Sequence, residues 1–434
     1  MRKKEMVLMS DLPKRGIGGY EPEPQFPPYA PDKYFYSHVG EGAWKGRRCF
    51  IIGGGPSLKG FDFSRLKGEL VIAVNRAWEH SSCAITFFLD EQFWGWTENG
   101  SLGKYAQENF LKHPSYKVTV NRNHFPYPEG INVVDYRRKA ESSDTLREGI
   151  YCGCNSGFAA LNLAVAMGAK EIYLLGFDMD AETDPQGKLT HYHNGYPEMG
   201  PNADLSMFRS EFHEIAPNLK AKDIWVINLN SQSYLKAFEF GDLNKIKPIH
   251  RPIIISFYTP EYADLAERMR RSANFFGLET DIVSVEKKGS WVETMYTRAQ
   301  FILDMLDKHG RDVVWLDSDA VIHKYPELFD DFKGDFGVHY ATFPWREEEE
   351  LLGGTMYFAN THKARELIEI WLRLNKELPR QELTQWILQQ AVQQWDGTLV
   401  RLPPTYTQIF DLMADRGDPV IEHFQASRKF RRTP

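Results

Sequence analysis

The sequence predicts an α/β protein with two domains, each organised around a largely parallel β-sheet. Short apolar segments alternate with helical segments along most of the chain, an order typical of parallel sheets. A proline-flanked stretch near residue 250 divides this alternation into two series. With 434 residues, the chain has room for two domains of about 100–200 residues each.

The composition is that of an ordinary folded protein without a membrane anchor. Hydrophobic residues make up 42% of the chain and charged residues 26%. No run approaches the roughly 18 apolar residues that cross a bilayer, and the first 16 residues lack the apolar stretch of a secretory signal. We therefore expect a soluble, cytoplasmic protein.

Cysteine content and net charge restrict the possible partners. Cys49, Cys83, Cys152 and Cys154 are too few and too irregularly spaced for a disulfide framework or a zinc site, so we expect reduced, mostly buried thiols. The net charge of −7 provides no overall positive field for nucleic acid. Residues 427–432 form a basic tail, which is either a local nucleic-acid patch or a solvated terminus.

Residues 1–45 are expected to form an extended arm, because their second part is dense in proline, glycine and tyrosine and lacks periodicity. The first α/β domain is expected over residues 46–248. A helix is predicted at residues 155–169, with Asn155 or Ser156 as its N-cap and Gly168 at its C-cap. The predicted strands cover residues 47–55, 70–77, 85–90, 171–179 and 223–230.

The second α/β domain is expected over residues 249–434, after a linker around residues 246–252. Its predicted helices and strands again alternate, which favours a second parallel sheet. Strands are predicted at residues 252–259, 279–286 and 312–319, and helices at residues 262–277 and 297–310.

Two acidic residues, Asp317 and Asp319, directly follow the apolar run of residues 313–316. In open α/β sheets the ligand crevice lies beyond this carboxyl end of the strands. Two carboxylates one residue apart can share a Mg²⁺ or Mn²⁺ ion whose other ligands include substrate phosphate oxygens. The pair therefore predicts a metal-diphosphate site, and a solvated turn is the alternative.

The stretch VVWLDSDAVIHKYP, residues 313–326, resembles the Asp-x-Asp region of GT-A glycosyltransferases, especially the family-eight-like enzymes. The resemblance implies that the second Rossmann-like domain has a GT-A-like nucleotide-diphospho-sugar transferase fold. It also implies sugar transfer from a nucleotide-sugar donor, with a UDP-sugar as the first choice. Asp317, Asp319 and the late His423 would then hold Mn²⁺ or Mg²⁺, and a surface or capping role is the alternative for His423.

Further segments extend this resemblance towards the donor and acceptor pockets. GGTMYFAN, with Gly353 and Gly354, is similar to the turn and strand that face the acceptor. RQELTQWILQQ, with Glu382 and Gln385, is similar to the helix start that lines the sugar pocket, and a polar helix face is the alternative. Arg298 stands where a donor-binding lysine is usual in these enzymes.

A glycine-rich turn follows the first predicted strand and consists of Gly53, Gly54, Gly55, Pro56 and Ser57. Glycines allow backbone N–H groups to come close to a phosphate, and the Ser57 hydroxyl would add a donor. The same residues could form only a tight strand-to-loop turn. Both readings are compatible with the sequence.

Four motifs occur in order within residues 47–240: VIAVNRA, FFLDEQFW, NSGFAALNLAVAMGAKEIYLLGFDM and HYHNGYP. Together they resemble the domain shared by MptE-like proteins and family-42 sialyltransferases, most closely its phage and prophage members. The resemblance implies that a nucleotide is surrounded by the glycine-rich turn, by Asn75, and by Ser156 and Gly157 at a helix start.

The last motif contributes two histidines, His191 and His193. By the resemblance, one of them would be a general base, since an imidazole titrates near neutral pH. A position in an exposed polar loop is the alternative. Gly54 departs from the asparagine that sialyltransferases carry in the glycine-rich turn.

Three functions from different classes follow. The leading one is a metal-dependent glycosyltransferase acting on an acceptor hydroxyl, with a modified DNA base as one acceptor if the chain is phage-encoded and works in the host cytoplasm. The second is a diphosphokinase or other nucleotide-handling enzyme in the first domain, which would use Gly55 and Asp178. The third is a non-catalytic phage accessory protein. Only the basic tail and aromatic residues such as Trp94, Trp96 and Trp345 favour nucleic acid.

Overall fold

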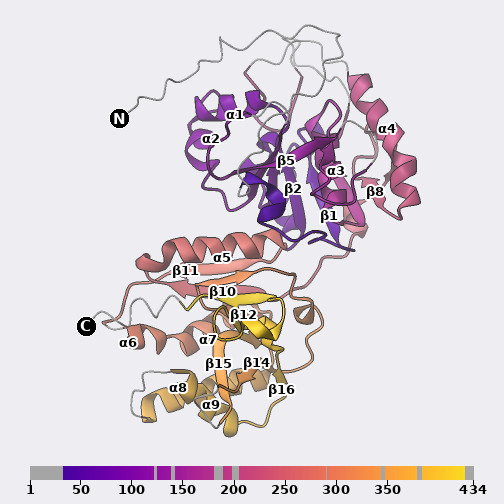
Figure 1. Ribbon diagram of the computed structural model, residues 1–434. Helices are drawn as coiled ribbons and strands as arrows, with labels where there is room; N and C mark the ends of the chain where they lie inside the picture. The colour runs from indigo at the N-terminus through magenta and orange to yellow at the C-terminus, as the bar shows by residue number, and fades with distance from the viewer. Residues whose placement is uncertain are drawn as a thin grey trace, which may run out of the picture.

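The computed structural model describes residues 33–121, 125–137, 142–179, 189–197, 205–289, 291–343, 348–378 and 384–425. They form two α/β domains, with the first above the second in the view of Figure 1. This arrangement confirms the predicted α/β class.

The first domain is built on a wholly parallel sheet with the strand order β6-β5-β4-β3-β2-β1-β7-β8-β9. The central strands β1 and β2 are apolar and almost entirely buried, as expected for a parallel sheet covered on both faces. The strands are β1 (Arg48–Ile52), β2 (Leu70–Val74), β3 (Ile85–Phe87), β4 (Tyr116–Asn121), β5 (Ile131–Arg137), β6 (Ile150–Tyr151), β7 (Glu171–Leu175), β8 (Trp225–Asn228) and β9 (Glu239–Phe240).

Helix α3 (Ser156–Ala166) lies at the centre of this domain, and ten of its eleven residues are buried. The Asn155 side chain caps it by accepting the Phe158 N–H at 2.7 Å, and Gly168 follows its C-cap with a φ of +90°. The predicted N-cap is thereby confirmed, whereas the C-cap is Met167 and the predicted glycine stands one residue beyond it. The other α-helices described in this domain are α1 (Glu91–Glu98), α2 (Lys104–Asn109) and α4 (Leu205–Ala221).

The described part of the predicted arm, residues 33–45, is folded rather than extended. Phe35, at the start of a short 3₁₀-helix (Phe35–Ser37), and Trp44 are both completely buried in the core. Burial of two large aromatic side chains stabilises this segment, a contribution that its irregular sequence pattern does not reveal. The first 32 residues of the arm lie outside the described part of the chain.

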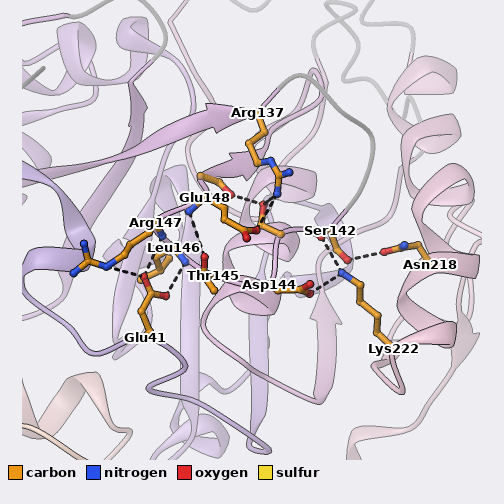
Figure 2. A network of polar contacts seen from close by, with 12 residues as sticks. Glu41, Arg137, Ser142, Asp144, Thr145, Leu146, Arg147, Glu148, Asn218 and Lys222 are labelled. Atoms are coloured by element: carbon orange, nitrogen blue, oxygen red, sulfur yellow. Dashed lines mark hydrogen bonds and ion pairs between the residues drawn. The ribbon is translucent and has the colours of Figure 1, made fainter. Parts of the chain in front are cut away.

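Residues 142–149, which lead into β6, are held by a network of polar contacts, shown in Figure 2. The Glu41 carboxylate accepts the backbone N–H groups of Leu146 at 2.9 Å and Arg147 at 3.1 Å. On the other side, Lys222 donates to Asp144 at 2.7 Å. Because β6 is followed directly by the start of α3, this network also fixes the approach to that helix.

The second domain contains a mixed sheet with the order β11-β10-β12-β15-β14-β16. Strands β11, β10 and β12 are parallel to one another, whereas β15 is antiparallel to both of its neighbours. A small sheet, β13-β18-β17, lies beside it. The strands are β10 (Ile253–Tyr258), β11 (Thr280–Ser284), β12 (Val313–Leu316), β13 (Ala320–Ile322), β14 (Phe336–Ala341), β15 (Glu350–Phe358), β16 (Leu399–Arg401), β17 (Gln408–Ile409) and β18 (Ile421–His423).

The strands and helices predicted before the acidic pair in this domain are all present. One expectation fails, because Gly353 and Gly354 lie inside β15 and not in a turn before a strand. Both glycines stand at a β-bulge of β15, where the register against β14 shifts between Val338 and His339, and pairing with distant strands on either side of the bulge carries the strand through them. The helices are α5 (Ala263–Phe275), α6 (Trp291–Met295), α7 (Arg298–His309), α8 (His362–Glu377) and α9 (Thr384–Gln393). None of the helices in the described part of the chain combines the length and apolar character that spanning a bilayer requires.

Candidate functional sites

Each domain has one point at which the order of its parallel strands reverses direction. In the first sheet this point lies between β1 and β7, and in the second it lies between β10 and β12. Loops leave such a point in opposite directions, so a crevice opens at the carboxyl ends of the strands and commonly binds the ligand. The glycine-rich turn follows β1 and Asp317 follows β12, so the predicted groups lie at the two switch points.

A cavity of about 390 Å³ opens at the switch point of the first domain. Its volume is in the range of small-molecule sites, and one wall is aromatic. The cavity brings together most of the residues predicted for this domain. Those that line it are Gly53, Gly54, Gly55, Pro56, Asn75, Ser156, Gly157, Asp178 and His191. The aromatic wall is formed by Phe93, Trp96, Phe177, Tyr196 and Phe208.

The glycine-rich turn shapes this cavity, but most of its N–H groups already have partners. The N–H groups of Gly53 and Gly55 donate to carbonyl oxygens of the β7 end at 2.8 and 2.9 Å, and that of Ser57 donates to the Asp178 carboxylate at 2.9 Å. A Cβ on Gly55 would lie 2.6 Å from the Gly176 carbonyl oxygen. These three N–H groups are therefore not available to surround a phosphate, contrary to the expectation from the sequence. The glycines permit close packing of β1 against β7, and Ser57 does not line the cavity.

Helix α3 supplies backbone donors that remain for a ligand. The N–H groups of Ser156 and Gly157 stand in its first turn, where the helix itself provides no acceptor. Both residues line the cavity. The positive end of the helix dipole also favours an anion at this point. Glu211 of α4 holds the segment directly before α3, because its carboxylate accepts the Cys154 N–H at 2.8 Å.

The structure distinguishes the two histidines. The Nδ1 atom of His191 lies 3.2 Å from the Gly54 carbonyl oxygen, so Nδ1 must carry the proton and Nε2 is left as an acceptor. That Nε2 atom is buried and has no hydrogen-bond partner among the described residues. Burial lowers the pKa of His191, so the ring is neutral at physiological pH. His191 thus lines the cavity with a neutral ring, and its remaining acceptor nitrogen is buried.

His193 has a supporting position instead. Its ring stacks on that of His191 with a centroid distance of 4.8 Å, and its Nδ1 accepts the Gly195 N–H at 3.1 Å. Burial, followed by the neighbouring His191, lowers the pKa of His193 to about 3. The ring does not line the cavity. Of the two candidates for a general base, the geometry favours His191.

Sequence reasoning missed several residues of the first site. Tyr196 packs edge-on against both histidine rings, and burial raises its pKa to about 12. Asn75 has a φ of +51°, a left-handed conformation that asparagine tolerates better than most residues. Asn230 donates to Asp178 and fixes that carboxylate. The HYHNGYP motif, which includes Tyr196, was the available signal for the first of these.

In the second domain, the two predicted aspartates face different partners. Oδ1 of Asp317 accepts the Trp315 indole N–H at 2.9 Å and lies 3.7 Å from Nη1 of Arg298. Burial raises the pKa of Asp317, and Asp319 adds to this effect, whereas Arg298 opposes it. The Oδ1 atom of Asp319 lies 3.8 Å from Nδ1 of His423.

His423 has one committed ring nitrogen and one that faces Asp319. Its Nε2 bonds to the Thr355 hydroxyl at 2.8 Å. Its Nδ1 is buried and lacks a hydrogen-bond partner among the described residues. A Cβ at Gly354 would contact the ring at 3.0 Å, so the glycine makes room for it.

The donor set fits a divalent cation in part. A carboxylate oxygen and a buried, unpartnered imidazole nitrogen are ligands that Mn²⁺ accepts, and Asp319 and His423 present these two atoms to each other. Within the described ranges, however, no three His, Cys, Asp or Glu side chains are assembled as a metal site. The expected group of three ligands is therefore corrected to a pair, with Asp317 close by but turned towards Trp315 and Arg298.

Arg298 is a buried positioning group in this site. It is 3% exposed, and it donates to the Gly353 carbonyl oxygen and to the Thr384 hydroxyl, both at 3.2 Å. These contacts join α7, β15 and α9 beside Asp317. Burial lowers the pKa of Arg298, and Asp317 opposes the shift. Its position next to the site agrees with the prediction. Its guanidinium N–H groups, however, donate to other protein groups rather than to a ligand in an open pocket.

The other two residues predicted for the sugar pocket have different outcomes. Gln385, in the first turn of α9, donates its side-chain amide to Glu350 at the start of β15. It therefore joins two elements that border the site. Glu382 lies outside the described residues, as do Trp345 and the basic tail.

Comparisons with known proteins give low similarities. No family profile and no curated protein matches the sequence. A glycosyltransferase involved in glycosylation of the major capsid of PBCV-1 is 19% identical, with a TM-score of 0.35, and the match covers 42% of this chain and 97% of that one.

Two further solved structures are similar at the same level. The galactosyltransferase LgtC, in complex with donor and acceptor sugar analogs, is 13% identical, with a TM-score of 0.29 and coverage of 40% of this chain and 87% of that one. The glycosyltransferase GlyE of Streptococcus pneumoniae TIGR4 is 12% identical, with a TM-score of 0.28 and coverage of 41% and 55%. Likenesses of this degree do not identify an activity.

Proposed function

We propose that this chain is a glycosyltransferase that transfers a sugar from a nucleotide-sugar donor, first of all a UDP-sugar, to an acceptor hydroxyl. One observation carries the proposal. At the switch point of the second sheet, Asp319 and an unpartnered, buried nitrogen of His423 face each other, with Asp317 beside them. The pair supports a bound cation at the place where open α/β sheets bind their ligands.

In this proposal Asp319 and His423 hold Mn²⁺ or Mg²⁺, and Asp317 lies beside the pair without being a ligand. The bound ion would neutralise the diphosphate leaving group as the sugar-phosphate bond breaks. The protein's own residues fix the site. Thr355 orients the His423 ring, and Arg298 holds Asp317 next to β15.

The test measures metal binding and turnover separately. Asp319→Asn and His423→Gln should each abolish the Mn²⁺-dependent rise in melting temperature with UDP, and should lower UDP-sugar turnover by about 100-fold or more. His323→Gln is the matched control, because this nearby histidine pairs with the Glu422 carboxylate at 2.9 Å on the side away from Asp319. Unchanged Mn²⁺ binding and turnover in both site variants would refute the proposal.

The acceptor class is tested by competition. Sugars, proteins and DNA containing a hydroxymethylated base are offered with the donor that stabilises the chain. DNA belongs in the screen because of the predicted phage resemblance, and the net charge of −7 works against it. A chain that binds neither Mn²⁺ nor any nucleotide would instead be a non-catalytic binding protein.

We further propose that the cavity of the first domain binds a nucleotide. Its size, its aromatic wall and the free N–H groups of Ser156 and Gly157 suit a base and a phosphate, and His191 offers a proton acceptor beside them. This retains a diphosphokinase as the second candidate. Release of AMP from ATP, abolished in His191→Leu, would favour it.

A further inference from the structure

The two domains meet through the ends of their sheets that are opposite to the candidate sites. Trp44 and the residues directly before β1, β2 and β3 form the contact surface of the first domain. On the second domain it is formed by the C-terminal end of α5 and the residues before β10 and β11. The contacts are Trp44 Nε1 to the Phe275 carbonyl (3.0 Å), Arg47 to the Phe276 carbonyl (3.2 Å), Asn274 to the Cys83 carbonyl, and Arg251 to the Gly68 carbonyl.

This junction is closely packed. A Cβ on Gly277 would lie 2.9 Å from the backbone of Glu69, so the chains of the two domains touch there directly. The guanidinium group of Arg47 stacks on the Tyr325 ring at 3.4 Å. One continuous buried cluster contains Phe35 and Trp44 from the first domain together with Phe275 and Phe276 from the second.

A hydrophobic interface of this kind opposes the hinge motion that separate domains otherwise show. Helix α5, which provides much of the contact, is visible between the two sheets in Figure 1. The orientation of the domains is therefore fixed by packing and not by the linker alone.

The positions of the two sites follow from this geometry. The first cavity lies beyond the carboxyl ends of β1, β2 and β7, and the acidic pair lies beyond the carboxyl end of β12. Both junction surfaces consist of residues at the amino ends of the strands. Since the strands run away from the junction in each domain, each candidate site opens at the edge of its sheet that is remote from the partner domain.

We infer that the chain carries two separate nucleotide sites that are filled at the same time and act independently, so that the first domain does not present an acceptor to the second. This inference rests on the proposed function for the identity of the second site. In this inference the first cavity binds its own nucleotide and supports its own reaction, and it is not part of one active site shared by both domains.

Calorimetric titration of the full chain tests this inference, with ADP, CDP, GDP and UDP as the probes, each with and without Mn²⁺. We expect two bound nucleotides per chain. Gln92→Trp, at an exposed position on the cavity wall, should weaken the Mn²⁺-independent site by about tenfold or more. Asp319→Asn should do the same to the Mn²⁺-dependent site. Each variant should leave the other dissociation constant within about twofold.

His191→Leu provides a second, smaller change in the same cavity if Gln92→Trp does not fold. One nucleotide per chain, or a change of more than about fivefold at the site of the unaltered domain, would overturn the inference. UDP-sugar turnover distinguishes this from a failure of the proposed function. A single shared nucleotide site with normal turnover would contradict the independence of the two sites but not the proposed function. Two uncoupled sites without turnover would contradict the proposed glycosyltransferase function but not the independence of the sites.

Discussion

At the scale of single residues, burial sets the chemistry of the ionisable groups in the first domain. Desolvation, with help from nearby cations, lowers the pKa of His113 to about 4 and that of Lys117 to about 7. Lys117 is tolerated inside the protein because its ammonium group donates to three backbone carbonyl groups. Burial keeps His193 neutral in the same way. The His191 ring, with its free nitrogen, therefore stacks on an uncharged ring.

These neutral histidines should make the protein sensitive to acid. The folded pKa of His113 lies below the unfolded value of 6.5, so the unfolded chain takes up the proton first and stability falls as the pH drops from about 6.5 towards 4. The wild type should lose unfolding free energy between pH 7 and pH 5. We predict that this loss is about 2 kcal/mol smaller in His113→Asn.

Urea unfolding at both pH values measures this change. His250→Asn, an exposed histidine of the linker, controls for the loss of one imidazole. Equal pH dependence in wild type and His113→Asn would show that burial does not shift this group.

At the scale of elements, the contact between the ends of β1 and β7 shows why the glycine-rich motif was compatible with two different structures. The glycine-rich turn predicted a phosphate loop or a tight turn, and the hydrogen bonds of Gly53 and Gly55 decide for close packing between strands. The free donors come from α3, a different element. Its well-signalled N-terminus was predictable because caps are local, whereas the partners of the turn are more than 100 residues away in the sequence.

We predict that Gly55→Ala destabilises the protein by about 1–3 kcal/mol, since its Cβ would meet the Asp178 carboxylate and the Gly176 carbonyl oxygen. The urea midpoint measures the loss. Gly40→Ala is the matched control, because nothing lies within 4 Å of a Cβ at that position. If both variants unfold at the same midpoint, the close approach of β1 and β7 is not as described.

At the scale of the whole molecule, the junction packs the two domains against each other in one buried cluster. Trp44 lies between them, fully buried, with its ring near that of Phe275 at a centroid distance of 5.6 Å. The sequence signalled neither this role nor the folded state of residues 33–45. Trp44 bonds to a residue 231 positions away, and residues 33–45 are also held by contacts with Leu146 and Met167, more than 100 residues away.

We predict a single thermal transition for the wild type and a loss of about 3–5 kcal/mol for Trp44→Ala. Differential scanning calorimetry should then show the transition broaden or split, as the domains begin to unfold separately. Trp225→Ala removes a tryptophan that is 54% exposed and should leave the single transition unchanged. Two transitions in the wild type would mean that the junction does not couple the domains.

The sequence by itself determined the features that depend on local order along the chain. These are the α/β alternation, the presence and N-cap of α3, and the position of Asp317 at a strand end, because periodicity and capping involve neighbouring residues. Only the tertiary structure decided which histidine faces the cavity, why Gly353 lies within β15, and how Asp319 meets His423. It also decided that the sheets join at their amino ends, since all of these depend on contacts between distant segments.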